Sequence, residues 1–322
     1  MSQSFNFHSL WYDSATTARG WIDASQTFQD WVTGIMTRAF RRSAGMNSFA
    51  IHLFIDAWPA GWMKTIMDVA CTPKKAWFTY RDALAPLAVS LRTDRSQVSG
   101  GEVIPVELWL CNDLPDETGI LTVEYDVTLD GRLIASGRSP SAASACAPAC
   151  QGLLQVKVPV VNQRSVLTIA ATLIDAAGQA IHGHEIGLDV FPALPVRNAA
   201  VWCPGAEEAT LRFVKRLGLE PVDYAEDADA ILIVGARGLS DHMAAILSRV
   251  QAGASAVLLE LPPANYHLGS ASITVREAGM GPRHFVSRAT GHPLVEGFEP
   301  NDFRFWFQCC PTRALNGSPI KH

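Results

Sequence analysis

Hydrophobic positions in the segment 1–85 change from helical spacing to a continuous apolar run and back again. Apolar residues recur at helical spacing over 28–39, which predicts an amphipathic helix that begins after Ser25 and ends at Gly45. The segment Ser48–Ile55 is nearly all apolar, which is typical of a buried parallel strand. A second helical pattern covers 74–84. Helix, buried strand, loop and helix together predict part of an α/β barrel or of a doubly wound sheet.

Short strand-like runs alternate with turn residues between residues 86 and 194. The expected strands are Leu87–Thr93, Val103–Cys111, Leu121–Leu129, Leu153–Val161, Leu167–Ile174 and Ile186–Phe191. The small-residue stretch from Ser139 to Ala149 is expected to be an exposed loop. Strands of this length and spacing are typical of an antiparallel, immunoglobulin-like β-sandwich.

Strand and helix patterns alternate in the last third of the chain. The expected strands are Asn198–Cys203, Ala230–Val234 and Ala256–Leu261, and the expected helices are Glu207–Leu217 and Ser240–Gln251. This β-α-β-α-β order predicts a small parallel sheet with crossover helices. We therefore expect a multi-domain α/β plus β protein, with domains at 1–85, 86–194 and 196–322.

Composition and charge exclude several classes of protein. The 322 residues are 48% hydrophobic and 18% charged with a net charge of −5, which excludes a disordered chain and predicts no nucleic-acid partner. No apolar run is long enough to span a membrane, and the N-terminus lacks a signal-peptide pattern, so the cytoplasm is the default compartment. The seven cysteines form no C-x-x-C pair, so we expect no disulfide framework, metal site or cofactor. The sequence gives no role for the adjacent Cys309 and Cys310.

The densest group of chemistry-bearing residues lies at the end of the expected strand 48–55. It consists of His52, Asp56, Trp58 and Trp62. In barrel enzymes the active site is built at this end of the strands, and flat indole rings suit the apolar faces of sugars. We therefore expect these four residues to bind a carbohydrate. The alternative is that the tryptophans fill a core and that the aspartate caps the following loop.

Five sequence pieces within residues 47–113 carry a family resemblance. They are Asp56-Ala-Trp-Pro-Ala-Gly-Trp62, Asp68, Thr72-Pro-Lys-Lys-Ala-Trp-Phe-Thr-Tyr80, Leu84-Ala-Pro-Leu-Ala-Val89 and Asn112-Asp113. In this order they resemble the end of the catalytic barrel of glycoside hydrolase family 2, which contains β-galactosidases, β-mannosidases and β-glucuronidases. The family commonly has a tryptophan at the position of His52, so the resemblance implies an altered or lost sugar contact there.

The resemblance implies hydrolysis with retention of configuration, which needs two glutamates. In the family both come from earlier barrel strands, whereas the first glutamate of this chain is Glu102. We therefore expect no catalytic residue in this chain, which would be inactive without a missing N-terminal part of the same enzyme. The expected protein is the C-terminal portion of a retaining exo-β-glycosidase that acts on the O-glycosidic bonds of β-linked sugars. The alternative is a non-catalytic carbohydrate-binding or scaffold protein.

The last segment resembles the flavodoxin-like, amidotransferase-like domains that are appended to some glycosidases. The matching pieces are Ile231-Leu-Ile-Val-Gly235, Gly291-His-Pro-Leu-Val-Glu-Gly-Phe298 and Asp302-Phe-Arg-Phe-Trp306. An active amidotransferase needs a nucleophilic cysteine on a sharp turn, and Cys203 lacks the preceding glycine, so we interpret it as a buried small hydrophobe.

Two further groups of residues receive ordinary interpretations. We expect His182 and His184 to be surface histidines at the end of a hairpin rather than metal ligands. We expect Arg38, Arg41 and Arg42 to form a solvated helix end rather than a nucleic-acid patch.

Overall fold

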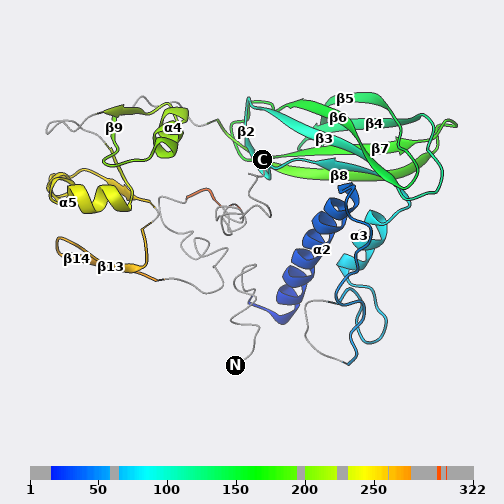
Figure 1. Ribbon diagram of the computed structural model, residues 1–322, viewed down its shortest axis with the longest axis horizontal. Coiled ribbons are helices and arrows are strands. Elements are labelled where there is room, and N and C mark those ends of the chain that lie inside the picture. The colour runs from blue at the N-terminus through cyan, green and yellow to red at the C-terminus, as the bar shows by residue number, and fades with distance from the viewer. Residues whose placement is uncertain are drawn as a thin grey trace. The chain divides into compact units, whose positions relative to one another are not determined.

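The computed structural model describes residues 16–58, 65–193, 200–222, 231–259, 261–276, 296–298 and 302 (Figure 1). The chain divides into two units. One contains residues 1–193 with 282–322, and the other contains residues 194–281. In the described part of the chain, no helix combines the length and the apolarity that a membrane crossing requires.

Two sheets pack together in the first unit and form an antiparallel β-sandwich (Figure 1). The smaller sheet has the order β1 (Leu87–Arg92), β3 (Val103–Asn112), β6 (Ala147–Lys157). The larger sheet has the order β2 (Gln97–Ser99), β8 (Ala180–Phe191), β7 (Ser165–Ile174), β4 (Leu121–Leu129), β5 (Arg132–Ser141). Neighbouring strands are antiparallel except for the β2–β8 pair. The expected antiparallel sandwich is therefore present.

The core of the sandwich comes from alternate residues on both sheets. Leu108 and Leu110 of β3 pack in one cluster with Leu167 and Ile169 of β7, and all four are at most 1% exposed. This alternation is what a strand with one buried face requires. The expected loop 139–149 is wrong at both ends, because β5 continues to Ser141 and β6 begins at Ala147.

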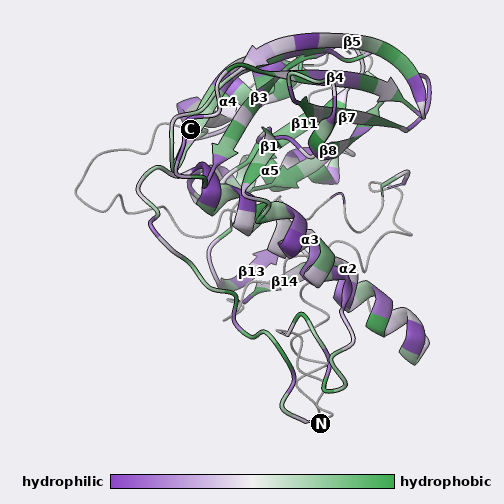
Figure 2. Ribbon diagram, turned by 90° about the vertical axis from the view of Figure 1, so that its right-hand side faces the viewer, coloured by the Kyte–Doolittle hydropathy of each residue, from purple (hydrophilic) through white to green (hydrophobic). Residues whose placement is uncertain are grey.

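Two helices precede the sandwich and run side by side, namely α2 (Ala18–Arg42) and α3 (Lys75–Ala83) (Figure 1). The hydroxyl of Thr17 accepts a hydrogen bond from the Gly20 amide, so Thr17 is the N-cap of α2. The expected start of the helix at Ser25 is wrong, because Ser25 lies within α2 and its hydroxyl donates to the Ile22 carbonyl oxygen. Figure 2 shows that α2 carries both hydrophobic and hydrophilic residues along its length.

The expected buried strand Ser48–Ile55 is not formed. Its backbone makes a single parallel bridge, in which Met67 donates to Phe54 and accepts from Asp56. Leu53 is 43% exposed and Phe54 is 52% exposed. A buried parallel strand needs a hydrogen-bonded neighbour on each side, and among the described residues only Met67 pairs with this segment.

The second unit contains the expected parallel sheet, with the order β10 (Glu220–Val222), β9 (Ala200–Trp202), β11 (Ile231–Val234), β12 (Ala256–Leu258). The unit also contains α4 (Glu208–Arg216), α5 (Ala236–Gln251) and a hairpin of β13 (Ala264–Leu268) and β14 (Ala271–Val275). Helix α5 begins before the expected Ser240, directly after Gly235. Trp202, Leu232 and Ile246 lie in its main core cluster.

Asp302, near the end of the chain, contacts the sandwich of the first unit. The Asp302 carboxylate is bound by both terminal nitrogens of Arg164, at 2.9 and 3.0 Å, and the side chain is 1% exposed. The Gln97 side-chain amide Nε2 donates to the main-chain carbonyl oxygen of Asp302 at 2.9 Å. Phe298 stacks against Phe191 with ring centroids 5.7 Å apart. These contacts fix the described part of the segment 282–322 to strands β2 and β8 and to the loop before β7.

Candidate functional site

The carboxylate of Asp56, one of the four expected sugar-binding residues, is bound by two side chains that follow it in the sequence. The Thr65 hydroxyl donates to one carboxylate oxygen at 2.7 Å, and Lys74 Nζ donates to the other at 3.0 Å. Lys74 Nζ also donates to the Thr65 hydroxyl oxygen. The Asp56 side chain is 8% exposed and the Lys74 side chain 14% exposed, so the ion pair is nearly buried. Both oxygens of this carboxylate are therefore satisfied by protein groups.

The other described site residues, His52 and Trp58, have different surroundings from Asp56. His52 lines a pocket against α2, and the residues that line this pocket do not include Asp56 or Trp58. Trp58 is 63% exposed. Trp62 lies outside the described residues. Among the described members, Trp58 is an exposed indole, His52 lines an apolar pocket and Asp56 is an ion-paired carboxylate.

The pocket of His52 is an apolar hollow of about 430 Å³ in the first unit. Helix α2 forms one wall, residues 49–52 form another, and Tyr80 of α3 also lines the pocket. The apolar side chains include Phe28, Val32, Met36, Phe40, Phe49 and Ile51. A volume of this size, with few polar groups, is typical of a small-molecule pocket. In the described part of the chain, no group of three His, Cys, Asp or Glu side chains could hold a metal ion.

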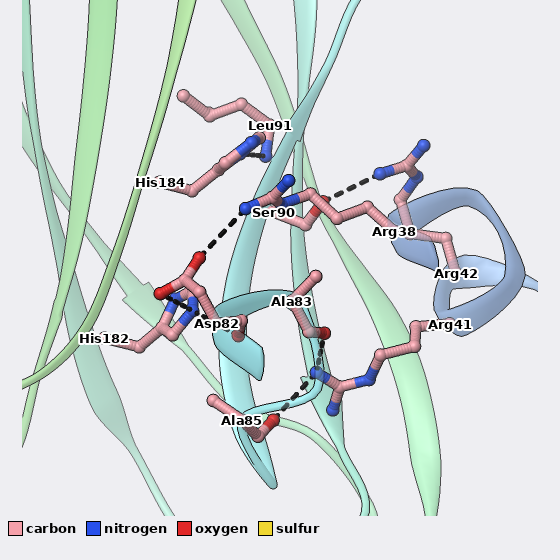
Figure 3. Close-up of polar contacts among 10 residues, drawn as sticks. All are labelled: Arg38, Arg41, Arg42, Asp82, Ala83, Ala85, Ser90, Leu91, His182 and His184. Atoms are coloured by element: carbon pink, nitrogen blue, oxygen red, sulfur yellow. Dashed lines mark hydrogen bonds and ion pairs between the residues drawn. The ribbon is translucent and has the colours of Figure 1, made fainter. Parts of the chain in front are cut away.

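A second polar cluster lies where the helices meet the sandwich, and the sequence interpretation missed it (Figure 3). Arg38 Nη2 donates to Asp82 Oδ2 at 2.9 Å. Arg41 is 9% exposed, and its Nη1 donates to the carbonyls of Ala83 and Ala85 at 2.8 and 2.7 Å. Arg42 donates to the Ser90 hydroxyl at 2.7 Å. The expectation of a solvated arginine end is therefore wrong, because these guanidinium groups join α2 to α3 and β1.

His182 and His184 belong to the same cluster, so the expectation of surface histidines is also wrong (Figure 3). His182 is 8% exposed, and its Nε2 lies 3.2 Å from the Asp82 carbonyl oxygen. His184 Nδ1 accepts the Leu91 amide hydrogen at 2.9 Å. A signal was present in the sequence, because His182 and His184 continue the alternation of Ile186, Leu188 and Val190 along one strand face.

Burial lowers the pKa of both histidines. Desolvation is the main cause for His184, helped by the positive charge of Arg38 and then by His182 and Arg42, and it lowers the pKa to about 3. Desolvation is also the main cause for His182, whose pKa is lowered although Asp82 opposes the shift. Both imidazoles are therefore neutral near pH 7.

Comparisons with known proteins find similarity in structure and none in sequence. No protein-family model and no curated protein matches the sequence. An exo-chitosanase from Amycolatopsis orientalis aligns with 56% of this chain and 21% of its own, at 14% identity and a TM-score of 0.42. A β-D-mannosidase from Dictyoglomus thermophilum aligns with 61% of this chain and 23% of its own, at 16% identity and a TM-score of 0.46. The chain thus spans about a fifth of the length of these two enzymes and is similar in structure to that part of them.

Proposed function

We propose that this chain is the C-terminal portion of a family-2-like retaining exo-β-glycosidase, which hydrolyses the O-glycosidic bonds of β-linked sugars. One observation carries the proposal: each of the five sequence pieces of the family resemblance contacts another of them. Asp56 of the first piece is ion-paired with Lys74 of the third at 3.0 Å. Asp68, the second piece, accepts the Thr72 amide hydrogen at 2.8 Å.

The last two pieces also meet. The Asp113 amide donates to the Pro86 carbonyl at 2.8 Å, and the Asp113 carboxylate is ion-paired with Arg41 of α2 at 2.9 Å. The Asp56–Lys74 and Asp113–Pro86 contacts join residues that are 18 and 27 positions apart in the sequence. The contacts between the pieces therefore support the proposal that 47–113 joins a catalytic barrel to its sandwich.

The proposed architecture follows from this junction. Residues 1–85 would be the C-terminal end of a catalytic barrel, 86–194 an immunoglobulin-like sandwich and 196–322 an amidotransferase-like α/β domain. The antiparallel sandwich and the parallel sheet support the last two assignments. Burial raises the pKa of Cys203, which keeps its thiol protonated and supports a non-nucleophilic role.

Sugar binding in this proposal depends on the aromatic and histidine side chains. Trp58 has a largely exposed indole, and together with His52 and Trp62 it would contact the sugar. Asp56 would act as a positioning residue, because its carboxylate is already bound by Thr65 and Lys74. The nearly buried ion pair would then hold the segment that carries Trp58.

The chemistry itself needs groups from elsewhere. A retaining glycosidase places two carboxyl groups about 5–5.5 Å apart, one as acid/base and one as nucleophile. The first glutamates of this chain, Glu102 and Glu107, lie on the sandwich and are ion-paired with Arg95 and Arg92. We therefore propose that a barrel portion with both catalytic glutamates is the partner that completes the enzyme.

The test compares this chain alone with this chain joined to the polypeptide encoded in phase upstream of it. Each form is assayed for nitrophenol release from nitrophenyl β-galactoside, β-mannoside, β-glucuronide and β-glucosaminide. We expect no turnover by the chain alone and turnover of at least one substrate by the joined form. Turnover by the chain alone that disappears in Asp56→Asn would refute the proposal. Sugar binding in affinity electrophoresis without hydrolysis by either form would favour a non-catalytic carbohydrate-binding protein.

A further inference from the structure

A small cavity lies between helix α2 and the sandwich, inside the polar cluster of Figure 3. The centre of a water-sized sphere can move within about 10 Å³ of this cavity, which is close to the minimum volume that one water molecule needs. Polar lining comes from Arg38 and Arg41 of α2, Ser90 of β1, Cys111 of β3 and His182 of β8. The cavity therefore has room for a single small occupant and groups that could bind it.

Three buried nitrogen atoms of these lining residues have no hydrogen-bond partner within the described part of the protein. They are Arg38 Nε, Arg41 Nε and His182 Nδ1. The opposite ends of the same side chains are engaged by the Asp82 carboxylate, by backbone carbonyls and by the Asp82 carbonyl. Buried polar atoms in native proteins are nearly always hydrogen-bonded, to protein or to ordered water. Three such atoms on the residues that line one cavity point to an occupant.

The hydrogen-bonding roles of the three nitrogens define that occupant. Each guanidinium Nε–H can only donate. His182 Nε2 faces a carbonyl oxygen at 3.2 Å, which can only accept, so Nε2 carries the hydrogen and Nδ1 presents a lone pair. The occupant must therefore accept two hydrogen bonds and donate one. A halide cannot donate and a metal cation cannot accept, whereas a water molecule does both.

We propose that this cavity holds one ordered water molecule, which accepts hydrogen bonds from Arg38 Nε and Arg41 Nε and donates one to His182 Nδ1. The water connects helix α2 to strand β8, two elements that lie far apart in the sequence. Ser90 also lines the cavity, and its hydroxyl oxygen already accepts a hydrogen bond from Arg42. The site does not depend on the proposed glycosidase function.

The site also requires a neutral His182, because a proton on Nδ1 would replace the lone pair by a donor. The charged groups that face His182 are Arg38 and Arg41 of α2 and Asp82 of α3, and the second titratable group on its own strand is His184. The thiol of Cys111 faces the cavity from β3 and is kept protonated by burial, which raises its pKa. The two arginines oppose a further positive charge, and only Asp82 favours it.

The first experiment is a crystal structure of the full chain at pH 8, at a resolution high enough to place ordered water molecules. We expect one density peak within about 2.7–3.2 Å of all three nitrogens. Crystals grown in sodium bromide provide the control, since anomalous scattering at the peak would identify an anion and overturn the proposal. An empty cavity between well-ordered side chains would overturn it as well.

The second experiment measures the histidine tautomer in solution. Two-bond ¹H–¹⁵N correlation of histidine-labelled protein at pH 8 should show His182 with the hydrogen on Nε2 and a bare Nδ1. A hydrogen on Nδ1 would contradict the assigned roles and overturn the proposal. In crystals of His182→Leu, which removes the acceptor, we expect the peak to be lost, whereas His184→Asn, outside the lining, should retain it. Where His182→Leu does not fold, the wild-type crystal and the tautomer still decide.

Discussion

Acidification should weaken the edge of strand β1 through His184. The Leu91 amide points away from its sheet and donates to His184 Nδ1, on a strand of the opposite sheet, at 2.9 Å. This contact requires the neutral imidazole, because a protonated Nδ1 has no lone pair to accept the hydrogen. Burial, together with the charges of Arg38, His182 and Arg42, lowers the pKa of His184 to about 3 in the folded protein.

The sign and size of the effect follow from linkage between proton binding and folding. The unfolded chain binds a proton at His184 once the pH falls below the ordinary value of 6.5, whereas the folded chain does so only near 3. The contribution to stability is therefore complete above pH 6.5 and is lost progressively as the pH falls from 6.5 to about 3. Each pH unit within this window is worth about 1.4 kcal/mol, so the expected loss between pH 8 and pH 5 is about 2 kcal/mol.

Hydrogen exchange of the β1 amides is the suitable assay, because the chain has two units and one global unfolding free energy is not defined. After correction for intrinsic exchange, protection of the Leu91 amide should fall roughly 30-fold between pH 8 and pH 5, which is the same loss of about 2 kcal/mol. In His184→Asn the amide oxygen takes the position of Nδ1 and cannot titrate, so most of this pH dependence should disappear. His182 supplies a remainder of the same sign, because its pKa is also lowered.

A matched control replaces a histidine outside the cluster. His267 is exposed on the β13–β14 hairpin of the second unit and contacts Ser272. His267→Asn should leave the protection of Leu91 at both pH values as in the wild type. The reasoning would be refuted if the wild type and His184→Asn lost the same factor of protection on acidification.

Two further changes test the loop and the second unit. Lys74→Met leaves the nearly buried Asp56 carboxylate without its cation, so urea unfolding should show that the helical region loses about 3 kcal/mol of stability. Adding Asp56→Asn removes the unpaired charge and should restore part of this stability. Equal stability of Lys74→Met and the wild type would contradict the prediction. In Gly238→Ala the new Cβ would lie 2.0 Å from the Pro204 carbonyl oxygen, so thermal unfolding should show that the second unit loses about 2 kcal/mol of stability. Gly235→Ala is the control, because a Cβ there meets nothing within 4 Å, and it should not show this loss.

The sandwich strands were predictable where one face of the strand is buried. They were not predictable where both faces are exposed. Strand β4 has the predicted bounds Leu121–Leu129, because its buried residues alternate with partly exposed ones. Strand β5 was missed, because its first five residues are all exposed, so the apolar alternation that predicts a strand is absent there. Its position is set instead by backbone pairing with β4.

The segment 48–55 shows the opposite failure. Its composition is that of a buried strand, yet its structure depends on neighbours that local sequence cannot supply, and the described residues offer it one bridge. The polar cluster was hidden for a different reason. Arginine and histidine are mostly surface residues, and only the strand parity of His182 and His184 indicates that they face inward.

The residues that carry the family resemblance make structural contacts in the described part of the chain. Asp56 binds Lys74, Asp68 binds the turn that follows it, and Asp113 binds Arg41 and the backbone of Pro86. The Asp113 contacts fix the path of the chain from the helices into the sandwich, and the Asp56 and Asp68 contacts fix the segment between α2 and α3. A pattern of this kind selects for an architecture and carries no proton-transfer chemistry. In the proposed enzyme, activity therefore has to be measured with the acid/base and the nucleophile present, because loss of these contacts would reduce turnover only through the position of the loop.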